Sequence, residues 1–435
     1  MAFGNDASAG TFAPNEGQAD AILKEIYSDD GITDEFFTNN PFYVMVPKKE
    51  NVTGRFYNQP VWASAGQASS RTYGASTSGP GVQAMANISG EQPFDYLVPK
   101  VENFVEANIS AKLIEESSSD KGSFVDMVRS IADNQLQQFA NDTAVGLYRS
   151  ADISRGNVGG SVAGATLTLS NVADAVNLEL GMFLEFAASN SGTTVRALAS
   201  NNTDCHITKV DYSSGVFTVA WTGSGTQTLT ANNVTVGDYI YRAGDKSLGF
   251  NGLADWIPYG GPSSSDSFLG VNRSAQAVRL AGNYLDGTVG NLEEVLEKAI
   301  NRVALMGGKL THFFMPYGQF TALANSQGSK VQTVTVKPNQ DANIGFEGIS
   351  VTGATGKVIC LPDRSCPSNT IFGLNLNSWK LISVGKAVHI WQKDGKVWLR
   401  NATAFGMAIR FYSLANLVCK EPRTNINIRV SPINV

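Results

Sequence analysis

The sequence predicts an α+β protein that carries an inserted all-β domain, and three observations lead to this prediction. Residues 118–149 contain no proline and repeat apolar side chains at roughly helical spacing, which indicates one long helix. Residues 101–113 alternate between apolar and polar side chains, the pattern of a half-buried strand. Residues 151–258 hold short β-prone segments separated by turn residues at intervals of about 8–12 positions, typical of a small barrel or sandwich.

The composition excludes several classes of protein. Charged residues make up 16% of the 435 residues, against about 25% in an average protein, and the net charge is −5. No run of Lys or Arg forms a basic stripe, so the composition argues against a nucleic-acid-binding protein. The four cysteines show no C-x-x-C spacing, which argues against a zinc or redox motif. We expect no signal peptide, because the N-terminus lacks a basic and then apolar segment, and no membrane span, because 18 consecutive apolar residues do not occur.

Catalytic motifs are also missing from the sequence. The three histidines, His206, His312 and His389, form no H-E-x-x-H pair, and no G-x-S-x-G motif occurs. Residues 307–309 (GGK) lack both the earlier glycine and the Ser or Thr of a phosphate-binding loop, and residues 353–357 fit a hairpin turn better. We therefore expect no enzyme, no catalytic residue, no cofactor and no metal site, and we expect His312 to be a core or interface residue.

The first hundred residues predict an arm and a ribbon. Residues 1–41 read as an N-terminal arm with one short helix, and residues 42–46 (FYVMV) as a strand. Strands at 56–62 and 92–98 flank a glycine-rich stretch, so residues 51–98 predict an extended two-stranded ribbon. Such a ribbon is marginal alone, so we expect it to lie largely on a neighbouring subunit. The candidate contact residues there are Phe56, Tyr57, Trp62, Arg71 and Tyr73.

Further elements follow in order. The long helix begins after Asp120, which can cap it, and the predicted β domain of residues 151–258 includes a segment at 227–234. Helices are then predicted at 273–285, 291–306 and 317–325. Strands are predicted at 311–316, within 357–400, and as a long closing strand at 405–419.

This order of parts resembles the major capsid proteins of tailed bacteriophages of the Hong Kong 97 type. Residues 373–428 carry the resemblance most closely, with a Trp379 strand, an Asp394-Gly395 turn and Asn-Leu-Val-Cys before Pro422 and Asn425. Residues 311–325 resemble the strand and helix of the family's axial domain, and residues 118–149 its spine helix.

The resemblance implies a domain division: arm 1–41; peripheral domain 42–50 and 99–150; E-loop 51–98; inserted β domain 151–258; axial domain and connections 259–400; closing strand and tail 401–435. It implies a virion shell protein that self-assembles in the host cytoplasm into hexamers and pentamers of an icosahedral head. Double-stranded DNA is enclosed without sequence-specific contact, and separate scaffolding, portal and decoration proteins are candidate partners. The alternatives are a β-rich surface-layer or adhesin protein and a tail-tube protein.

Two expectations concern contacts between copies. The family's Lys–Asn cross-link needs an E-loop lysine, and residues 51–99 contain none, so we expect no cross-link. Residues 1–40 hold eight acidic residues and one basic residue (1 − 8 = −7), and residues 379–429 hold nine basic and two acidic residues (9 − 2 = +7). We therefore expect the arm, through Asp29, Asp30, Asp34 and Glu35, to dock on the C-terminal region of a neighbouring copy.

Overall fold

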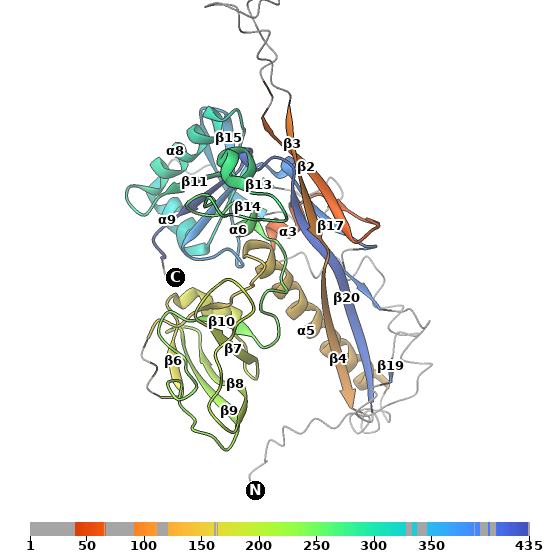
Figure 1. Cartoon of the computed structure of the whole chain (residues 1–435). Helices are drawn as coiled ribbons and strands as arrows, with labels where there is room; N and C mark the ends of the chain where they lie inside the picture. Colours follow the sequence, from red (N-terminus) through yellow and green to blue (C-terminus); the bar gives the residue numbers. More distant parts are fainter. Residues whose placement is uncertain are drawn as a thin grey trace, which may run out of the picture.

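Over the residues that it describes, the computed structural model contains three large sheets and one two-stranded ribbon, arranged around a long helix (Figure 1). The structure describes residues 40–64, 66, 91–110, 121–160, 162, 164–327, 333–336, 346–386, 388–391, 399–400 and 406–433. The mixed α/β character that the sequence predicts is therefore present.

The first sheet is built around one long strand, β20 (Gly406–Cys419). All of β4 (Val101–Ser110) pairs antiparallel with residues 406–415 of β20. The sheet is completed by β1 (Lys48–Lys49), β17 (Trp379–Ser383), β18 (His389–Ile390) and β19 (Leu399–Arg400). The period-2 alternation places Ala107 and Ile109 of β4 in the core, which confirms a half-buried strand after residue 100.

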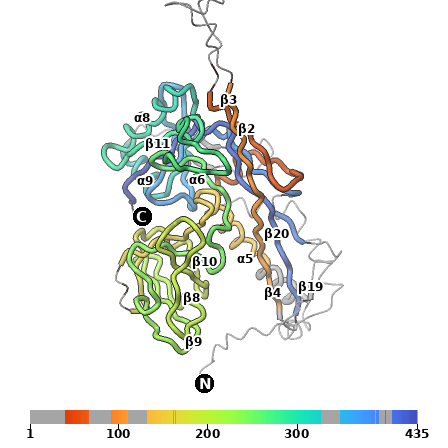
Figure 2. Tube along the Cα trace, viewed as in Figure 1, coloured from red at the N-terminus to blue at the C-terminus, as the bar shows by residue number. Residues whose placement is uncertain are grey.

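The long helix is α5 (Lys121–Tyr148), which runs beside β4 in both views (Figures 1 and 2). Its 28 residues correspond to a length of about 42 Å. Leu136, Phe139 and Leu147 are buried in the main core between the helix and the first sheet. The predicted helix is confirmed, whereas the proposed cap Asp120 lies outside the described residues.

The predicted strand at 42–46 is wrong, because the chain forms a short helix, α3 (Pro41–Met45). Proline occupies its first turn, where its fixed φ suits a helix start and its missing N–H costs nothing. The ring of Phe42 lies 5.3 Å from that of Tyr148 and 5.2 Å from that of Phe314. An uninterrupted apolar run has no periodicity, so the sequence could not separate a buried helix from a buried strand.

The second sheet has seven strands in the order β11-β21-β16-β12-β15-β14-β13. Their bounds are β11 (Asn283–Asp286), β12 (His312–Met315), β13 (Thr333–Val336), β14 (Phe346–Gly353), β15 (Gly356–Pro362), β16 (Thr370–Leu374) and β21 (Ile426–Arg429). Helices α8 (Leu292–Leu305) and α9 (Tyr317–Gln327) pack on it around a separate core. Both predicted helices are confirmed, as is the hairpin turn at 353–356.

Residues 156–242 form the third sheet, called here the β unit, with the order β5-β10-β7-β8-β9-β6. The strands are β5 (Gly156–Asn157), β6 (Thr166–Thr168), β7 (Phe183–Ala187), β8 (Asn202–Asp211), β9 (Val216–Gly223) and β10 (Tyr239–Arg242), with a 3-10 helix η1 (Val172–Asn177). The unit has its own apolar core, and it lies apart from the other two sheets in Figure 2.

Two features of the predicted β domain are corrected. Residues 227–234 form turns instead of a strand, because the side-chain amide of Asn232 donates to the carbonyls of Thr226 and Thr228. The domain also ends before residue 258, since α6 (Leu253–Trp256) belongs to the main core. There the buried Trp256 Nε1 donates to the Leu417 carbonyl at 3.0 Å.

The predicted helix at 273–285 is also wrong. A 3-10 turn η2 (Arg273–Gln276) leads into α7 (Ala277–Ala281), which ends at Gly282. Gly282 has φ +78°, a conformation that glycine adopts without penalty. The chain then enters β11, which lies parallel to β21.

The predicted division between the last two segments differs from the sheets that form. β17, β18 and β19 pair with β20, so part of segment 259–400 belongs to the first sheet. β21 lies between β11 and β16, so part of segment 401–435 belongs to the second.

A buried polar contact joins these two sheets. Asn425 follows the 3-10 turn η5 (Pro422–Thr424), and its Oδ1 accepts from Trp379 Nε1 at 2.8 Å and from the Asn375 N–H at 2.8 Å. Its Nδ2 donates to Ser378 Oγ, in η4 (Leu376–Ser378), at 3.0 Å. Fully paired buried amides of this kind fix the relative position of the elements that carry them.

Candidate assembly surface

The ribbon consists of β2 (Phe56–Ser64) and β3 (Gln92–Pro99), paired antiparallel, and it extends away from the body at the top of Figure 1. Alternation divides its side chains into two faces. One face packs on the chain itself and the other meets solvent. The predicted strands at 56–62 and 92–98 are therefore confirmed.

The exposed apolar side chains of the solvent face are called here the outer stripe: Phe56, Pro60, Trp62, Pro93 and Leu97. Two exposed polar residues, Asn58 and Asp95, lie among them on the same face. Trp62 is 54% exposed, Leu97 49% and Phe56 45%. Trp62 pairs with Pro93 across the ribbon, so large apolar groups lie directly opposite each other. An apolar stripe that includes an exposed Trp is typical of a protein–protein contact.

The inner face of the ribbon base packs on the same chain. Val61, Tyr96 and Val98 are buried. The Tyr96 ring lies 5.1 Å from the Trp256 ring, and Tyr96 Oη donates to the Leu280 carbonyl at 3.0 Å. The expectation that the ribbon lies largely on a neighbour is thus corrected for its base, whose support comes from its own subunit.

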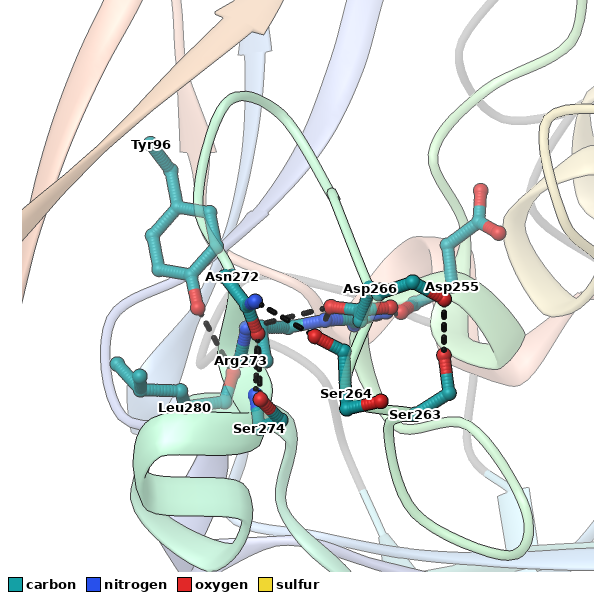
Figure 3. A network of polar contacts seen from close by, with 10 residues as sticks. Tyr96, Asp255, Ser263, Ser264, Asp266, Asn272, Arg273, Ser274 and Leu280 are labelled. Carbon is teal, nitrogen blue, oxygen red and sulfur yellow. Dashed lines mark hydrogen bonds and ion pairs between the residues drawn. The ribbon is translucent and has the colours of Figure 1, made fainter.

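Figure 3 shows the loop on which Tyr96 rests. Arg273 is buried and forms a bidentate pair with Asp266, with Nε to Oδ2 at 2.8 Å and Nη2 to Oδ1 at 3.0 Å. Its Nη1 donates to the Asp255 carbonyl at 2.5 Å. The guanidinium also lies 4.3 Å from the ring of Phe268, which packs against Tyr96. Because the Arg273 guanidinium donates two hydrogen bonds to the same carboxylate, the loop is held in one geometry beneath the ribbon.

Lysine side chains contact the base of the ribbon at Tyr57 and Gln59. Lys380 Nζ lies 3.3 Å from Tyr57 Oη and 3.4 Å from Gln59 Oε1, and Lys49 Nζ lies 3.4 Å from the same Tyr57 Oη. Partial burial of Tyr57 opposes ionisation, but the two ammonium groups outweigh it and lower the pKa of the phenol. Lys100 Nζ donates to the carbonyls of Val52 and Gly54, both at 2.6 Å.

The predicted contact residues fall into three groups. Phe56 and Trp62 lie in the outer stripe, and Tyr57 is half-buried against its own chain. Arg71 and Tyr73, with Asp29, Asp30, Asp34 and Glu35, lie outside the described residues. Sequence reasoning missed Leu97, Pro60 and Pro93. Period-2 alternation within each strand could have placed them on one face, but the register that aligns the two strands could not be read.

The basic side of the proposed arm contact is partly occupied within the chain. Arg410 Nε pairs with Glu106 Oε2 at 2.8 Å, Lys380 is held at Tyr57, and Arg423 lies 3.9 Å from Glu421. The charge that residues 379–429 can offer a partner is therefore smaller than the sequence total indicates. Docking of the arm remains a prediction.

The described residues form neither a metal site nor a membrane-spanning helix, and among them His312 stands out as a histidine with a lowered pKa. In that part of the chain, no group of three or more His, Cys, Asp or Glu side chains could hold a metal ion. Nor is any described helix long and apolar enough to cross a membrane. Burial lowers the pKa of His312 to about 4, and its Nδ1 lies 3.0 Å from Thr311 Oγ1, as expected for a neutral histidine at the edge of the core.

The chain is similar to several solved structures, and to no known family model or curated protein. Among solved structures, the capsid of cyanophage A-1(L) matches with a TM-score of 0.48 at 9% identity, over 89% of this chain and 92% of that one. An encapsulin complex from Synechococcus elongatus matches at 0.43 and 8%, over 90% and 88%. The capsid of a native GTA particle matches at 0.42 and 9%, over 98% and 95%.

Proposed function

We propose that this chain is the major capsid protein of a tailed-phage head, and that many copies assemble as hexamers and pentamers into an icosahedral shell around double-stranded DNA. The observation that carries the proposal is the outer stripe. A ribbon that projects from the body with Trp62, Leu97 and Phe56 exposed is suited to binding another copy. The sequence resemblance supplies the class of assembly.

We assign the parts of the fold to those of the proposed family. The helix α5 serves as the spine helix, the sheet around β20 as the peripheral domain and the seven-stranded sheet as the axial domain. The ribbon is the base of the E-loop, and the β unit is the insertion. In this role the chain is a container, neither an enzyme nor a cofactor-binding protein, and it is found in the virion after assembly in the host cytoplasm.

The low content of charged residues supports a shell protein that encloses DNA without binding it tightly. Binding to DNA phosphates requires clustered Lys and Arg, and affinity grows with each such contact. A chain with a net charge of −5 and no basic run is unsuited to tight, sequence-specific binding. Scaffolding, portal and decoration proteins remain candidate partners.

Electron microscopy of the purified full-length chain tests the proposal. Closed icosahedral particles or separate hexamers and pentamers are expected. Flat lattices or fibrils would favour the surface-layer or adhesin alternative, and open tubes the tail-tube alternative. A chain that stays monomeric at every concentration and salt would contradict all three.

A further inference from the structure

Positive side chains gather at the base of the ribbon, where β2 begins and β3 ends. Lys49 Nζ and Lys380 Nζ lie 3.4 and 3.3 Å from the same atom, Tyr57 Oη. Lys100 Nζ donates at 2.6 Å to two carbonyls of the loop that leads into β2, and Arg55 is the last residue of that loop. These four cations, Lys49, Arg55, Lys100 and Lys380, are called here the basic cluster.

Acidic side chains do not balance the basic cluster. Three segments form the base of the ribbon, residues 46–57, 96–101 and 379–384. They hold five cations, the cluster and Lys48, against one acid, Glu50, so their charge is 5 − 1 = +4. The next acids along these strands are Asp95 and Glu102, and with them the total is still 5 − 3 = +2. No member of the cluster forms an ion pair with another described residue.

The groups that hold the cluster in place are neutral. Lys380 and Lys49 contact the Tyr57 hydroxyl, and Lys100 contacts backbone carbonyls. Lys49 and Arg55 are exposed. Burial opposes the ionisation of Tyr57, yet the ammonium groups of Lys380 and Lys49 lower the pKa of its phenol, as expected beside uncompensated positive charge. The cluster therefore keeps its charge for a partner.

The N-terminal arm carries the opposite charge. Residues 1–40 total 1 − 8 = −7, and they lie almost wholly outside the described residues. Four of their acids fall within seven positions: Asp29, Asp30, Asp34 and Glu35. The position of the cluster suits a partner from another copy, because Arg55 directly precedes Phe56 of the outer stripe. The positive surface is thus continuous with the apolar surface that we propose for contacts between copies.

We propose that the basic cluster binds the acidic segment 29–35 in the arm of a second copy. Opposite charges of this size speed association and fix the register of two surfaces more than they add affinity. Of residues 379–429, only Lys380 belongs to this surface, so the contact is narrower than the sequence total for that region indicates. The inference rests on the proposed assembly, because the arm comes from a neighbouring copy.

Carbodiimide cross-linking of particles assembled from full-length chains tests the inference. The reagent joins a carboxylate directly to a lysine amine, so it reports ion pairs without a spacer. Particles are assembled from an equal mixture of ordinary and heavy-isotope chains, and the cross-linked peptides are identified by mass spectrometry. Segment 29–35 should be linked to Lys49, Lys100 and Lys380, with mixed-isotope pairs among the products. The Glu294–Lys298 ion pair of α8 is the internal control and should be linked only within one copy.

Removing charge from the cluster should weaken the contact. Lys49→Gln combined with Arg55→Gln changes two exposed side chains, so the fold should stay intact. At low salt, the yield of arm links to Lys100 and Lys380 should fall about threefold, because exposed ion pairs are individually weak. At higher salt the difference from wild type should shrink, since screening already reduces the attraction.

The matched control is Lys298→Gln combined with Lys309→Gln, which removes the same charge from exposed positions far from the ribbon in sequence. It should leave the arm links unchanged, and an equal loss in this variant would overturn the inference. Arm links found only within one copy, or chiefly to other lysines, would also overturn it. Particles without any arm link would overturn this inference alone, whereas chains that form no particles would overturn the proposed function with it.

Discussion

At the scale of single residues, Asp363 is a buried acid on which three segments converge. Its Oδ2 accepts from Tyr148 Oη at 2.8 Å, at the end of α5, and from the Phe42 N–H of α3 at 3.4 Å. Its Oδ1 accepts from the Ser365 N–H at 2.9 Å. Burial raises the pKa of Asp363 to about 6, and the three hydrogen bonds only partly oppose that rise.

The raised pKa predicts a specific pH dependence of stability. The folded chain holds the Asp363 proton more tightly than the unfolded chain, whose aspartates titrate near about 3.9. The contribution of Asp363 to the free energy of unfolding is therefore fully present below about pH 4, and it is lost as the pH rises to about 6. Two pKa units correspond to about 3 kcal/mol. In Asp363→Asn, the free energy of unfolding should fall less over this pH range, as measured by denaturant titration at each pH.

Asp211→Asn is the control for this prediction. Hydrogen bonds from Ser213 and Ser214 lower the pKa of the exposed Asp211 to about 2, so its contribution is lost only as the pH falls below about 4. In Asp211→Asn, the free energy of unfolding should change between pH 4 and 6 as it does in wild type. Equal slopes in Asp363→Asn and wild type would show that Asp363 does not titrate in this window.

At the scale of elements, the C-terminus of α5 depends on one glycine. A Cβ at Gly252 would lie 2.2 Å from the Arg149 carbonyl oxygen and 2.6 Å from those of Gly146 and Leu147. These are backbone atoms, which cannot move aside as a side chain does. We predict that Gly252→Ala lowers the free energy of unfolding by about 1–3 kcal/mol.

Gly164→Ala is the matched control for Gly252→Ala. A Cβ there meets its nearest atom, the Thr166 nitrogen, at 3.9 Å, which is ordinary contact. Chemical denaturation should find it within about 0.5 kcal/mol of wild type. If both variants have the same free energy of unfolding, the close packing of Gly252 against the end of α5 does not contribute to stability.

The two faces of the ribbon predict opposite effects of substitution. Trp62→Ser and Leu97→Ser change exposed side chains, so the unfolding midpoint should stay near that of wild type while the yield of assembled particles falls several-fold. Val61→Ser changes a buried side chain of the same strand and should lower stability itself. Sedimentation separates assembled from free chains. Normal particle yields from Trp62→Ser would rule out the outer stripe as an assembly contact.

Local patterns predicted those elements whose packing is periodic. Helix α8 has apolar residues spaced along one face, Glu293 and Glu294 in its first turn and two glycines after it, so its bounds were predicted within one residue. The prediction of a helix at 273–285 is wrong because the end of the helix depends on the backbone of Gly282 and on pairing with β21. That strand lies more than a hundred residues away in the sequence. Trp256 was assigned to the wrong unit for the same reason: its partner is Leu417.

At the scale of the whole molecule, the β unit has an apolar core of its own. β5 and β10 are antiparallel neighbours, and the Arg155 N–H donates to the Ile240 carbonyl at 2.7 Å, so the two connections leave side by side. We predict that replacing residues 156–242 with a short glycine linker preserves the fold of the rest, whereas removing 151–258 unfolds it. The larger deletion takes Phe250, Trp256 and Ile257 out of the main core.

Circular dichroism and thermal unfolding of both deletions measure this difference. Asp142→Asn should accompany the larger deletion, since the loss of Arg155 would leave a buried carboxylate unpaired. Two deletions that unfold alike would place the β unit within the folding core.

The position of β20 and β21 has a consequence for how the chain is made. β20 holds together the first sheet, and β21 lies between β11 and β16 in the second, yet both strands fall within the last thirty residues. During synthesis, domains usually fold as units from the N-terminus. Here the first sheet cannot close before residue 419 has left the ribosome, nor the second before residue 429, whereas the β unit can fold once residue 242 has emerged. Until then α5 has no sheet to cover its apolar face, and the nascent chain is exposed to aggregation or to capture by a chaperone.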